Sequence, residues 1–269
     1  MNDAAIGVFD SGMGGLTVVH ALRARLPLER IVYLGDTARL PYGTKSADTV
    51  RRYALQAARA LTAHGVKLVV IACNTASVSL PALKGALAPL PVIGVVEPGA
   101  QAALAAAPEG PIAVIATEGT VKGGAYVRAI GARGSAPVVQ QACPLFVPMS
   151  EEGLTEGPIA EAVAHRYLDP LLATVPKPKS LLLGCTHYPA LKDIIAHVAG
   201  PDIAIVDSAE TTAAAVETLL REENLAAPTR TPQPPSFLVT DAPDRFARVG
   251  EAFLGEPIDP GAVELVDLQ

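Results

Sequence analysis

The sequence lacks the long hydrophobic run that a membrane-spanning helix requires. Its apolar stretches, such as residues 68–72, are soon interrupted by polar residues or proline, and none approaches the roughly 18 uninterrupted residues that a span needs. Residues 1–9 carry no positive charge ahead of their apolar segment and no long apolar core, so they are not typical of a secretory signal. We therefore expect a cytoplasmic protein that is neither exported nor embedded in a membrane.

Charged residues are also scarce. They make up 18% of the chain, with 21 Lys and Arg against 27 Asp and Glu, for a formal net charge of −6. No basic cluster matches a phosphate backbone, so we expect no nucleic-acid partner, although a small anionic ligand stays possible because local dipoles can outweigh net charge. Half of the 269 residues are hydrophobic, which excludes disorder as the main state and suits one large or two small domains.

Cysteine is the third scarcity. The chain holds three cysteines, Cys73, Cys143 and Cys185. An odd, sparse set without CxxC spacing argues against a disulfide framework and against a structural zinc site. The pattern favours free thiols in a reducing compartment.

Short branched apolar runs recur along the chain and are typical of strands buried on both faces. They lie at residues 6–9, 31–34, 68–72, 92–95, 112–115, 181–183, 203–206 and 237–239. Between several of them the apolar spacing is helical, as in residues 46–63 and 209–223, with polar residues suited to N-caps at the start. The alternation predicts an α/β fold with parallel sheets flanked by helices.

Polar residues follow the predicted strands, where an open parallel sheet binds its ligand. These residues are Asp10 and Ser11, Asp36 and Thr37, Cys73 with Asn74 and Thr75, Glu97, Thr117, and Cys185 with Thr186 and His187. Polar residues follow strands in most α/β proteins, so one position alone proves little. Two of these positions hold cysteine, however, which usually prefers the core.

A faint internal repeat relates residues 69–75 to residues 181–187. Each has three large apolar residues, a small one, a cysteine and then polar groups. The two copies are too far apart for a solenoid repeat of roughly 20 to 50 residues and fit two half-size, pseudo-symmetric domains with an active site in the cleft between them. The segments most typical of surface linkers are residues 226–235 and 175–179, which are rich in proline.

A glycine-rich turn at residues 10–15 precedes a helix expected near Leu16. Amides at such a helix start can hold a carboxylate or a phosphate. The third glycine position of the dinucleotide fingerprint holds Thr17, and no Gly-Lys-Ser/Thr follows, so neither a dinucleotide site nor a P-loop is expected. The alternative is a tight structural turn with Asp10 as the N-cap.

Cys73 and Cys185 are the main candidates for an acid/base pair. A thiol has an ordinary pKa of about 8.5, so modest help from its surroundings yields thiolate near neutral pH. If the two halves face one another, the two sulfurs can flank one ligand, and one can remove a proton from a carbon while the other returns it on the opposite side. His187 and Asp10 are the candidate helpers.

Other uses of these cysteines stay open at this point. Both can be inert core residues, as we expect for Cys143. Cys73, Cys185 and His187 can supply three metal ligands, and the two cysteines can form a redox-active disulfide. The remaining histidines fall in helical stretches and are expected to be solvated or capping residues: His20, His64, His165 and His197.

Several motifs together resemble the glutamate racemase family, within the cofactor-independent aspartate/glutamate racemase superfamily. They are GVFDSGMGGLT at residues 7–17, YLGDT at 33–37, LPYG at 40–43, ACNTAS at 72–77, GVVEPG at 94–99 and LGCTHYP at 183–189. The first and last are fairly specific alone, and the set spans most of the chain.

The resemblance implies an enzyme that interconverts L- and D-glutamate, the latter for bacterial peptidoglycan, with neither cofactor nor metal. It implies that Cys73 and Cys185 are the acid/base pair, that Asp10 and His187 assist them, and that Glu152 supports the histidine. Expected substrate contacts are Asp10, Ser11, Tyr42, Gly43, Asn74, Thr75, Thr117, Thr120, Thr186 and His187.

The resemblance also implies two domains, one of residues 1–97 plus 208–269 and one of residues 98–207, and a homodimer. The departures from the family pattern, at Arg39 and Leu40 and between Thr117 and Thr120, affect loop detail rather than the cysteines. Two alternatives remain: a racemase for aspartate or another amino acid, and a protein that binds a ligand or senses thiols without catalysis.

Overall fold

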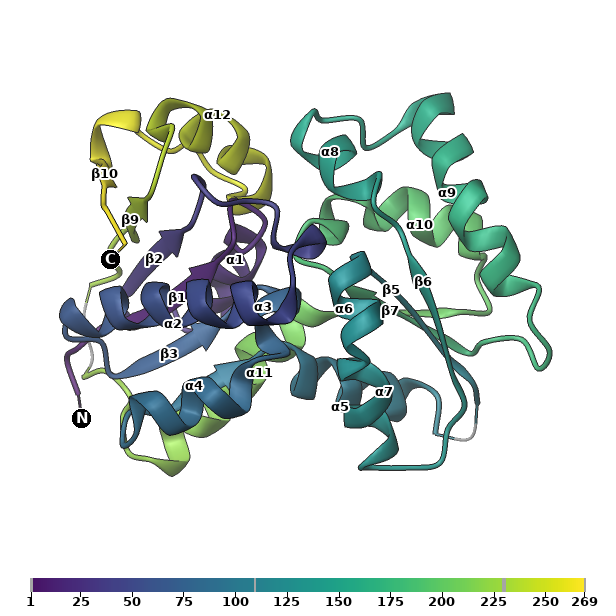
Figure 1. Ribbon diagram of the computed structural model, residues 1–269, viewed down its shortest axis with the longest axis horizontal. Coiled ribbons are helices and arrows are strands. Elements are labelled where there is room, and N and C mark those ends of the chain that lie inside the picture. Colours follow the sequence, from purple (N-terminus) through teal and green to yellow (C-terminus); the bar gives the residue numbers. More distant parts are fainter. Residues whose placement is uncertain (1, 109, 229–230, 269) are drawn as a thin grey trace.

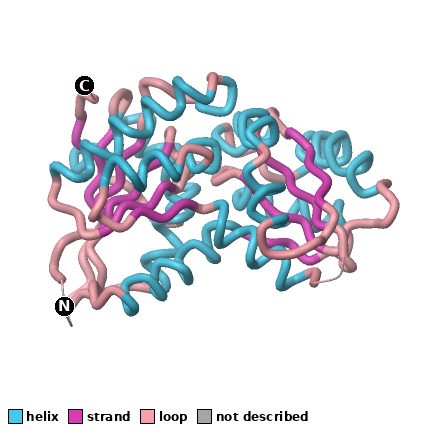
Figure 2. Tube along the Cα trace, turned by 60° about the horizontal axis from the view of Figure 1, so that its bottom comes forward, coloured by secondary structure: helices cyan, strands magenta, loops and turns pink. Residues whose placement is uncertain are grey.

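A computed structural model describes residues 2–108, 110–228 and 231–268. Within these residues the strands form one six-stranded and one four-stranded sheet, and every strand pair is parallel. The two sheets lie side by side, each enclosed by helices (Figure 1, Figure 2). The predicted α/β fold with parallel sheets flanked by helices is confirmed.

The larger sheet has the order β10-β9-β2-β1-β3-β4. Its strands are β1 (Ile6–Asp10), β2 (Ile31–Gly35), β3 (Leu68–Ile71), β4 (Val92–Gly94), β9 (Ser236–Val239) and β10 (Val263–Leu265). Helices α1 (Leu16–Arg25), α11 (Ser208–Glu222) and α12 (Pro243–Leu254) pack on one face. Helices α2 (Ala47–Ala63) and α4 (Leu80–Leu87) pack on the other, and the short η1 (Tyr42–Thr44), α3 (Asn74–Ser77) and η3 (Pro260–Ala262) lie in connections.

The smaller sheet has the order β6-β5-β7-β8. Its strands are β5 (Ile112–Ala116), β6 (Val138–Ala142), β7 (Ser180–Gly184) and β8 (Ala204–Asp207). Helices α5 (Val96–Ala106) and α7 (Ala125–Gly131) pack on one face. The other face carries α8 (Phe146–Glu151), α9 (Gly157–Leu172) and α10 (Lys192–Ala199), while α6 (Glu118–Gly123) and η2 (Tyr188–Leu191) follow strands β5 and β7.

The two sheets share one strand order. In the larger sheet β2-β1-β3-β4 are neighbours, and in the smaller sheet β6-β5-β7-β8 are neighbours, so β1 corresponds to β5 and β3 to β7. The two repeated cysteine segments therefore occupy equivalent places, one after β3 and one after β7.

Sequence patterns located the helices well where a cap was present. Ser46 caps α2 by accepting a hydrogen bond from the amide of Thr49, and Asp207 caps α11 by accepting one from the amide of Ala209. Helix α1 begins at Leu16, as expected, but its N-cap is Gly15 rather than Asp10 and has no side-chain cap. The Asp10 carboxylate is instead used inside the turn.

The apolar runs of the sequence did not predict two of the strands. Strand β6 has the sequence VVQQA and lies at the edge of its sheet, half-buried throughout, so it has no continuous apolar run. Strand β10 has only three residues, VEL, at the edge of the larger sheet, and two of them are exposed. Both strands are only partly buried, so no continuous apolar run marks them.

The expected division of the chain into domains stays a prediction. Its boundary at residues 97/98 falls within the first turn of α5, and its boundary at 207/208 falls between β8 and α11. Residues 229 and 230 of the expected linker at 226–235 lie outside the described residues.

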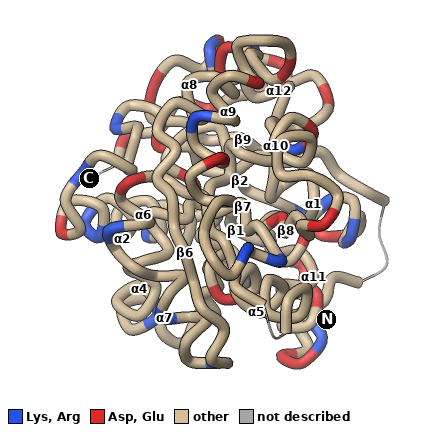
Figure 3. The backbone as a smooth tube through the Cα atoms, turned by 90° about the vertical axis from the view of Figure 1, so that its right-hand side faces the viewer, with Lys and Arg blue, Asp and Glu red and all other residues tan. Residues whose placement is uncertain are grey.

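Charged residues of both signs are interspersed over the face turned to the viewer in Figure 3.

Candidate active site

The two cysteines of the repeat lie just beyond the carboxyl ends of equivalent strands. Cys73 follows β3 and is the N-cap of α3, while Cys185 directly follows β7. Each side chain is about 95% buried, since 5% of each residue remains exposed. The sulfurs are close enough that a negative charge on Cys185 would raise the pKa of Cys73. The fold thus brings together two thiols from different sheets.

Cys73 is held as a thiol. Its Sγ accepts a hydrogen bond from the amide of Ala76 at 3.4 Å and donates one to the Ser11 hydroxyl at 3.5 Å. Burial, and then the negative charge of Asp10, raise the pKa of Cys73 to about 12, against the opposing effect of these two hydrogen bonds. Near neutral pH this group therefore carries its proton.

Cys185 is next to a charged histidine. Its Sγ lies 3.9 Å from Nδ1 of His187, whose Nε2 lies 3.2 Å from Oε1 of Glu151. Burial lowers the pKa of His187, but the hydrogen bonds with Cys185 and Glu151 and the negative charges of Cys185 and Asp10 raise it to about 10. The imidazole is therefore protonated at neutral pH, with a cation beside the Cys185 sulfur.

The acidic partner of His187 is Glu151, which corrects the expectation for Glu152. Glu151 ends α8 with its side chain only 11% exposed, whereas Glu152 caps the helix and is exposed to solvent. Adjacent residues on a helix differ by about 100° in direction, so only one of two consecutive glutamates can face the histidine. The sequence Ser-Glu-Glu-Gly does not indicate which one.

Asp10 is the acidic residue on the side of Cys73. One of its carboxylate oxygens accepts a hydrogen bond from the Gly12 amide at 2.9 Å, and the other accepts one from the Thr186 hydroxyl at 3.5 Å. Burial raises the pKa of Asp10, although the positive charge of His187 and backbone hydrogen bonds oppose this rise. The negative charge of Asp10 acts on both Cys73 and His187, raising the pKa of each.

The glycine-rich turn approaches the site more closely than side chains would permit. Tyr33 on β2 donates a hydrogen bond to the Gly12 carbonyl at 2.9 Å, which holds the turn in place. A Cβ on Gly14 would overlap the ring of His187 and the hydroxyl of Thr186, and a Cβ on Gly15 would overlap Asp10. These glycines are required for close approach, not for backbone conformation.

Hydroxyl and amide groups from both halves line the same region. The hydroxyls of Thr75, Thr117 and Thr120 lie 2.9 to 3.3 Å from one another, which links α3 to the turn after β5. The Asn74 amide donates to the Tyr126 hydroxyl at 2.7 Å, while its Oδ1 is buried without a hydrogen-bond partner among the described residues. An unpaired buried acceptor costs about 1–3 kcal/mol, so this atom is suited to receive a donor from a ligand.

Tyr42 and Gly43 belong to a loop that closes the site on the side of the larger sheet. The Tyr42 hydroxyl is hydrogen-bonded to Asp36, which also forms an ion pair with Arg39 at 2.7 Å. A Cβ on Gly43 would lie 2.9 Å from Cβ of Thr117, so the loop touches the smaller half there. Since the phenol is occupied by Asp36, Gly43 is the part of this pair that remains available to a ligand.

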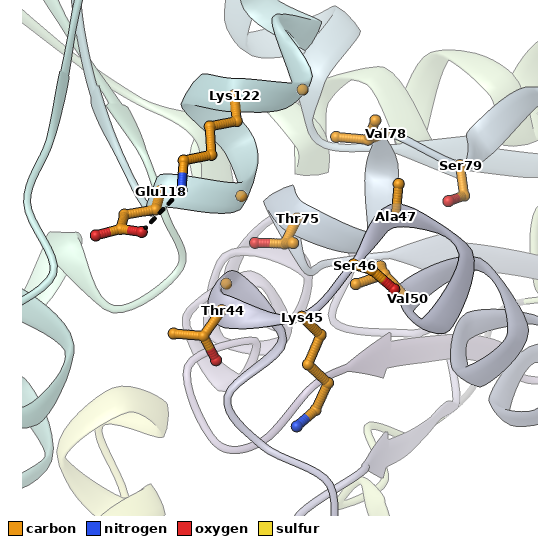
Figure 4. A pocket seen from close by; sticks show the side chains of 13 residues that line it. Thr44, Lys45, Ser46, Ala47, Val50, Thr75, Val78, Ser79, Glu118 and Lys122 are labelled. Carbon is orange, nitrogen blue, oxygen red and sulfur yellow. Dashed lines mark hydrogen bonds and ion pairs between the residues drawn. The ribbon is translucent and has the colours of Figure 1, made fainter.

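A pocket of about 310 Å³ borders the site at Thr75. Figure 4 shows it between the segment Thr44–Val50 and the Glu118–Lys122 ion pair of α6. Thr75 lies between these two walls. Thr75 therefore belongs both to the threonine cluster and to the lining of this pocket.

The expected site residues fall into two groups. The structure gathers Asp10, Ser11, the two cysteines, Asn74, Thr75, Thr117, Thr120, Thr186 and His187 through the contacts above. Glu97 does not join them, because it pairs with Arg133 at 2.5 Å and is half exposed. Cys143 is fully buried in the core of the smaller half, and burial raises its pKa. No three His, Cys, Asp or Glu side chains are grouped for metal binding within residues 2–108, 110–228 and 231–268.

The assignment of Glu151 leads to a first prediction. Replacing Glu151 by Gln removes the anion that holds the proton on His187, so the pKa of His187 falls toward its ordinary value. We expect catalytic turnover to drop by roughly tenfold and the alkaline limb of its pH profile to move to lower pH. Glu152→Gln is the matched control and should leave both unchanged; equal effects of the two substitutions would contradict the assignment.

In sequence, the chain is similar to known racemases. Residues 16–216 match the Asp/Glu/hydantoin racemase family. The chain is 47% identical to the glutamate racemase of Syntrophus aciditrophicus, with 98% of this chain and 96% of that protein covered, and 48% identical to the glutamate racemase of Geobacter metallireducens, with 93% of each covered.

Solved structures agree in fold. The crystal structure of glutamate racemase from Francisella tularensis in complex with D-glutamate superposes with a TM-score of 0.91 at 38% identity. The match covers 100% of this chain and 99% of that one. The similarity therefore extends over both sheets.

Proposed function

The chain belongs to the Asp/Glu/hydantoin racemase family and is a racemase, and from that premise we propose that it interconverts L- and D-glutamate by proton transfer between two cysteines. The matches to its glutamate racemase relatives span nearly the whole length of this chain and of each relative. The Francisella relative binds D-glutamate in its crystal structure, which supports glutamate as the substrate here.

The observation that carries the proposal is the pair of buried thiols, Cys73 and Cys185, after equivalent strands of two sheets. Inversion at a carbon requires one base and one acid on opposite sides of it. Two thiols supplied by separate halves of the molecule meet that requirement, whereas two groups from one strand end would approach from the same side. His187 and Asp10 give the two sulfurs different surroundings.

We propose the following proton balance. One cysteine, as thiolate, takes the Cα proton; the electron pair of the broken C–H bond remains on Cα and spreads into the α-carboxylate. The other cysteine, as thiol, then donates its proton to the opposite face of Cα. The reverse reaction exchanges the two roles, and the substrate leaves with the same atoms and no net change in charge.

The surroundings of each sulfur support this division of work. Cys73 rests as a thiol, because burial and Asp10 raise its pKa to about 12, and so it can act as the acid. The protonated His187 places a positive charge 3.9 Å from the sulfur of Cys185, on the side from which the base is proposed to act. In the reverse direction Cys73 is the thiolate and Cys185 is the thiol, so Asp10 lies on the side of the base and His187 on the side of the acid.

Substrate binding is proposed for the polar groups that line the two sulfurs. The unpaired Oδ1 of Asn74 can accept a hydrogen bond from the substrate ammonium. The hydroxyls of Thr75, Thr117 and Thr120 can donate to a carboxylate, together with Ser11, Thr186 and the Gly43 backbone. A closed, preorganised polar site of this kind stabilises charge that develops on the substrate without a cofactor.

Further proposals rest on family membership alone. They are that the product D-glutamate supplies peptidoglycan synthesis, that the enzyme works in the cytoplasm as a homodimer, and that residues 1–97 with 208–269 and residues 98–207 form its two domains. Among the described residues, no helix has both the length and the apolar character needed to cross a bilayer.

The test is a racemisation assay with purified protein and reduced thiols. L-Glutamate and, separately, L-aspartate are incubated without added cofactor or metal, and optical rotation is followed. The proposal predicts that glutamate racemises and aspartate does not. Racemisation of aspartate instead would identify the runner-up racemase, and inactivity toward both would favour a binding or thiol-sensing protein that retains the fold.

A further inference from the structure

Glu151 has a second partner besides His187. Its Oε1 faces His187 Nε2 at 3.2 Å, while its Oε2 accepts a hydrogen bond from Nη2 of Arg245 at 2.9 Å. Each carboxylate oxygen thus contacts one cation. Glu151 is 11% exposed and Arg245 is 40% exposed on their side chains, so the ion pair closes the solvent side of the histidine.

The Arg245 contact spans the two halves of the molecule. Arg245 lies in the first turn of α12, which packs on the larger sheet, whereas Glu151 ends α8 on the smaller sheet. Figure 1 shows these two helices facing one another at the top of the molecule. Phe253 of α12 also packs edge-on against the His187 ring, with centroids 5.2 Å apart. One helix therefore holds both the histidine and its carboxylate.

We propose that Arg245 is a positioning residue for racemisation, which orients and keeps ionised the Glu151 carboxylate and through it the imidazolium next to Cys185. This inference rests on the proposed function. Without Arg245, either oxygen of Glu151 is free to rotate toward water, and the histidine loses the fixed partner on its Nε2 side. Arg245 acts on the proton transfer that Cys185 performs, and it contacts the sulfur of neither Cys73 nor Cys185.

Electrostatics are consistent with this arrangement. Burial raises the pKa of Glu151, yet the hydrogen bonds from His187 and Arg245 and their positive charges outweigh burial and leave it below its ordinary value. The charged or titratable groups facing this pair are His187 from the β7 end and Arg245 from α12, with Cys185 and Asp10 facing the histidine in turn. Removing Arg245 takes away one of the two cations that oppose burial.

The experiment compares Arg245→Met with Arg248→Met, which removes an exposed arginine of the same helix that lies outside the site. We expect Arg245→Met to lower kcat about fivefold with KM nearly unchanged, a modest effect because the arginine is partly exposed. The acid limb of the pH profile should move to higher pH, because the pKa of Glu151 rises. Arg248→Met should match the wild type.

Two further variants separate positioning from simple structural support. Arg245→Lys, which keeps a cation in reach of Glu151, should recover part of the lost kcat and return the acid limb toward its wild-type position. In a Glu151→Gln background, Arg245→Met should cause no additional loss, because its effect passes through Glu151. A loss that persists in that background, or an Arg245→Met enzyme indistinguishable from Arg248→Met, would overturn the inference. Absence of racemisation by the wild type would instead reject the proposed function.

Discussion

Replacing either Cys73 or Cys185 by serine is expected to lower kcat/KM for glutamate racemisation by at least about 10³-fold. A positioned acid or base contributes roughly 10²- to 10⁴-fold, and a serine hydroxyl is far less acidic than a thiol, so it can neither form the base nor deliver the proton efficiently. Each substitution removes one face of the reaction, and inversion needs both. The measurement is steady-state racemisation in both directions, started separately from each enantiomer.

The control for the cysteine variants is Cys143→Ala. Cys143 is fully buried in the core of the smaller sheet, and its thiol donates a hydrogen bond to the Gln141 carbonyl rather than to a side chain of the site, so this variant should keep near wild-type racemisation. Circular dichroism and thermal unfolding establish that all three variants fold. A Cys73→Ser or Cys185→Ser enzyme that folds and keeps more than about a tenth of wild-type activity would be incompatible with a two-thiol mechanism.

Gly14→Ala is expected to lower kcat/KM by about 10²-fold, although the substitution adds a single methyl group. A Cβ at this position would overlap Nδ1 and Cε1 of His187 and the hydroxyl of Thr186. Both side chains are about 95% buried, so neither can move into solvent to make room. A displacement of about 1 Å of a catalytic group can cost 10²-fold in rate, and here the displaced group is the histidine beside Cys185.

Gly85→Ala is the matched control for the Gly14 variant. Gly85 lies in α4, and a Cβ there would have no heavy atom within 4 Å. Alanine in a helix interior is favoured over glycine by roughly 0.5–1 kcal/mol, so this variant should fold at least as well as the wild type and racemise at the same rate. Full activity of Gly14→Ala would show that the turn has more room than its contacts with His187 allow.

The core strands could be predicted because burial on both faces leaves a mark in the sequence. The runs that became β1, β3, β5 and β7 are almost wholly apolar, and each is fully buried. Strand β6 has glutamines at two of its five positions and is half-buried throughout, so no run of apolar residues marks it. Position in the sheet, which decides burial, is settled only by the folded chain.

The site could be anticipated to the extent that its residues follow strands. Cys73, Cys185 and Thr117 lie at strand ends in a pattern that predicts their meeting, and the structure gathers them. The choice between Glu151 and Glu152 depended on the direction of a helix that begins at Phe146, and two consecutive glutamates give no periodicity to read. Sequence alone therefore located the segment and missed the residue.

Arg245 left no signal in the sequence. It follows Asp241 and Asp244 in an ordinary charged helix start and is far along the chain from both cysteines. Its contact with Glu151 arises because α12 of one half meets α8 of the other. Contacts between halves depend on how two sheets are placed, which no local pattern encodes.

The most direct measurement of the two-thiol account follows deuterium during the first turnovers of L-glutamate in heavy water. With one thiol on each face, the proton removed by the first cysteine is not the one returned by the second, so the D-glutamate formed early should carry solvent deuterium at Cα. The remaining L-glutamate should still carry protium. Deuterium entering the recovered L-glutamate as fast as D-glutamate forms would instead indicate a single base that serves both faces, and would contradict the assignment of Cys73 and Cys185 to opposite sides of the substrate.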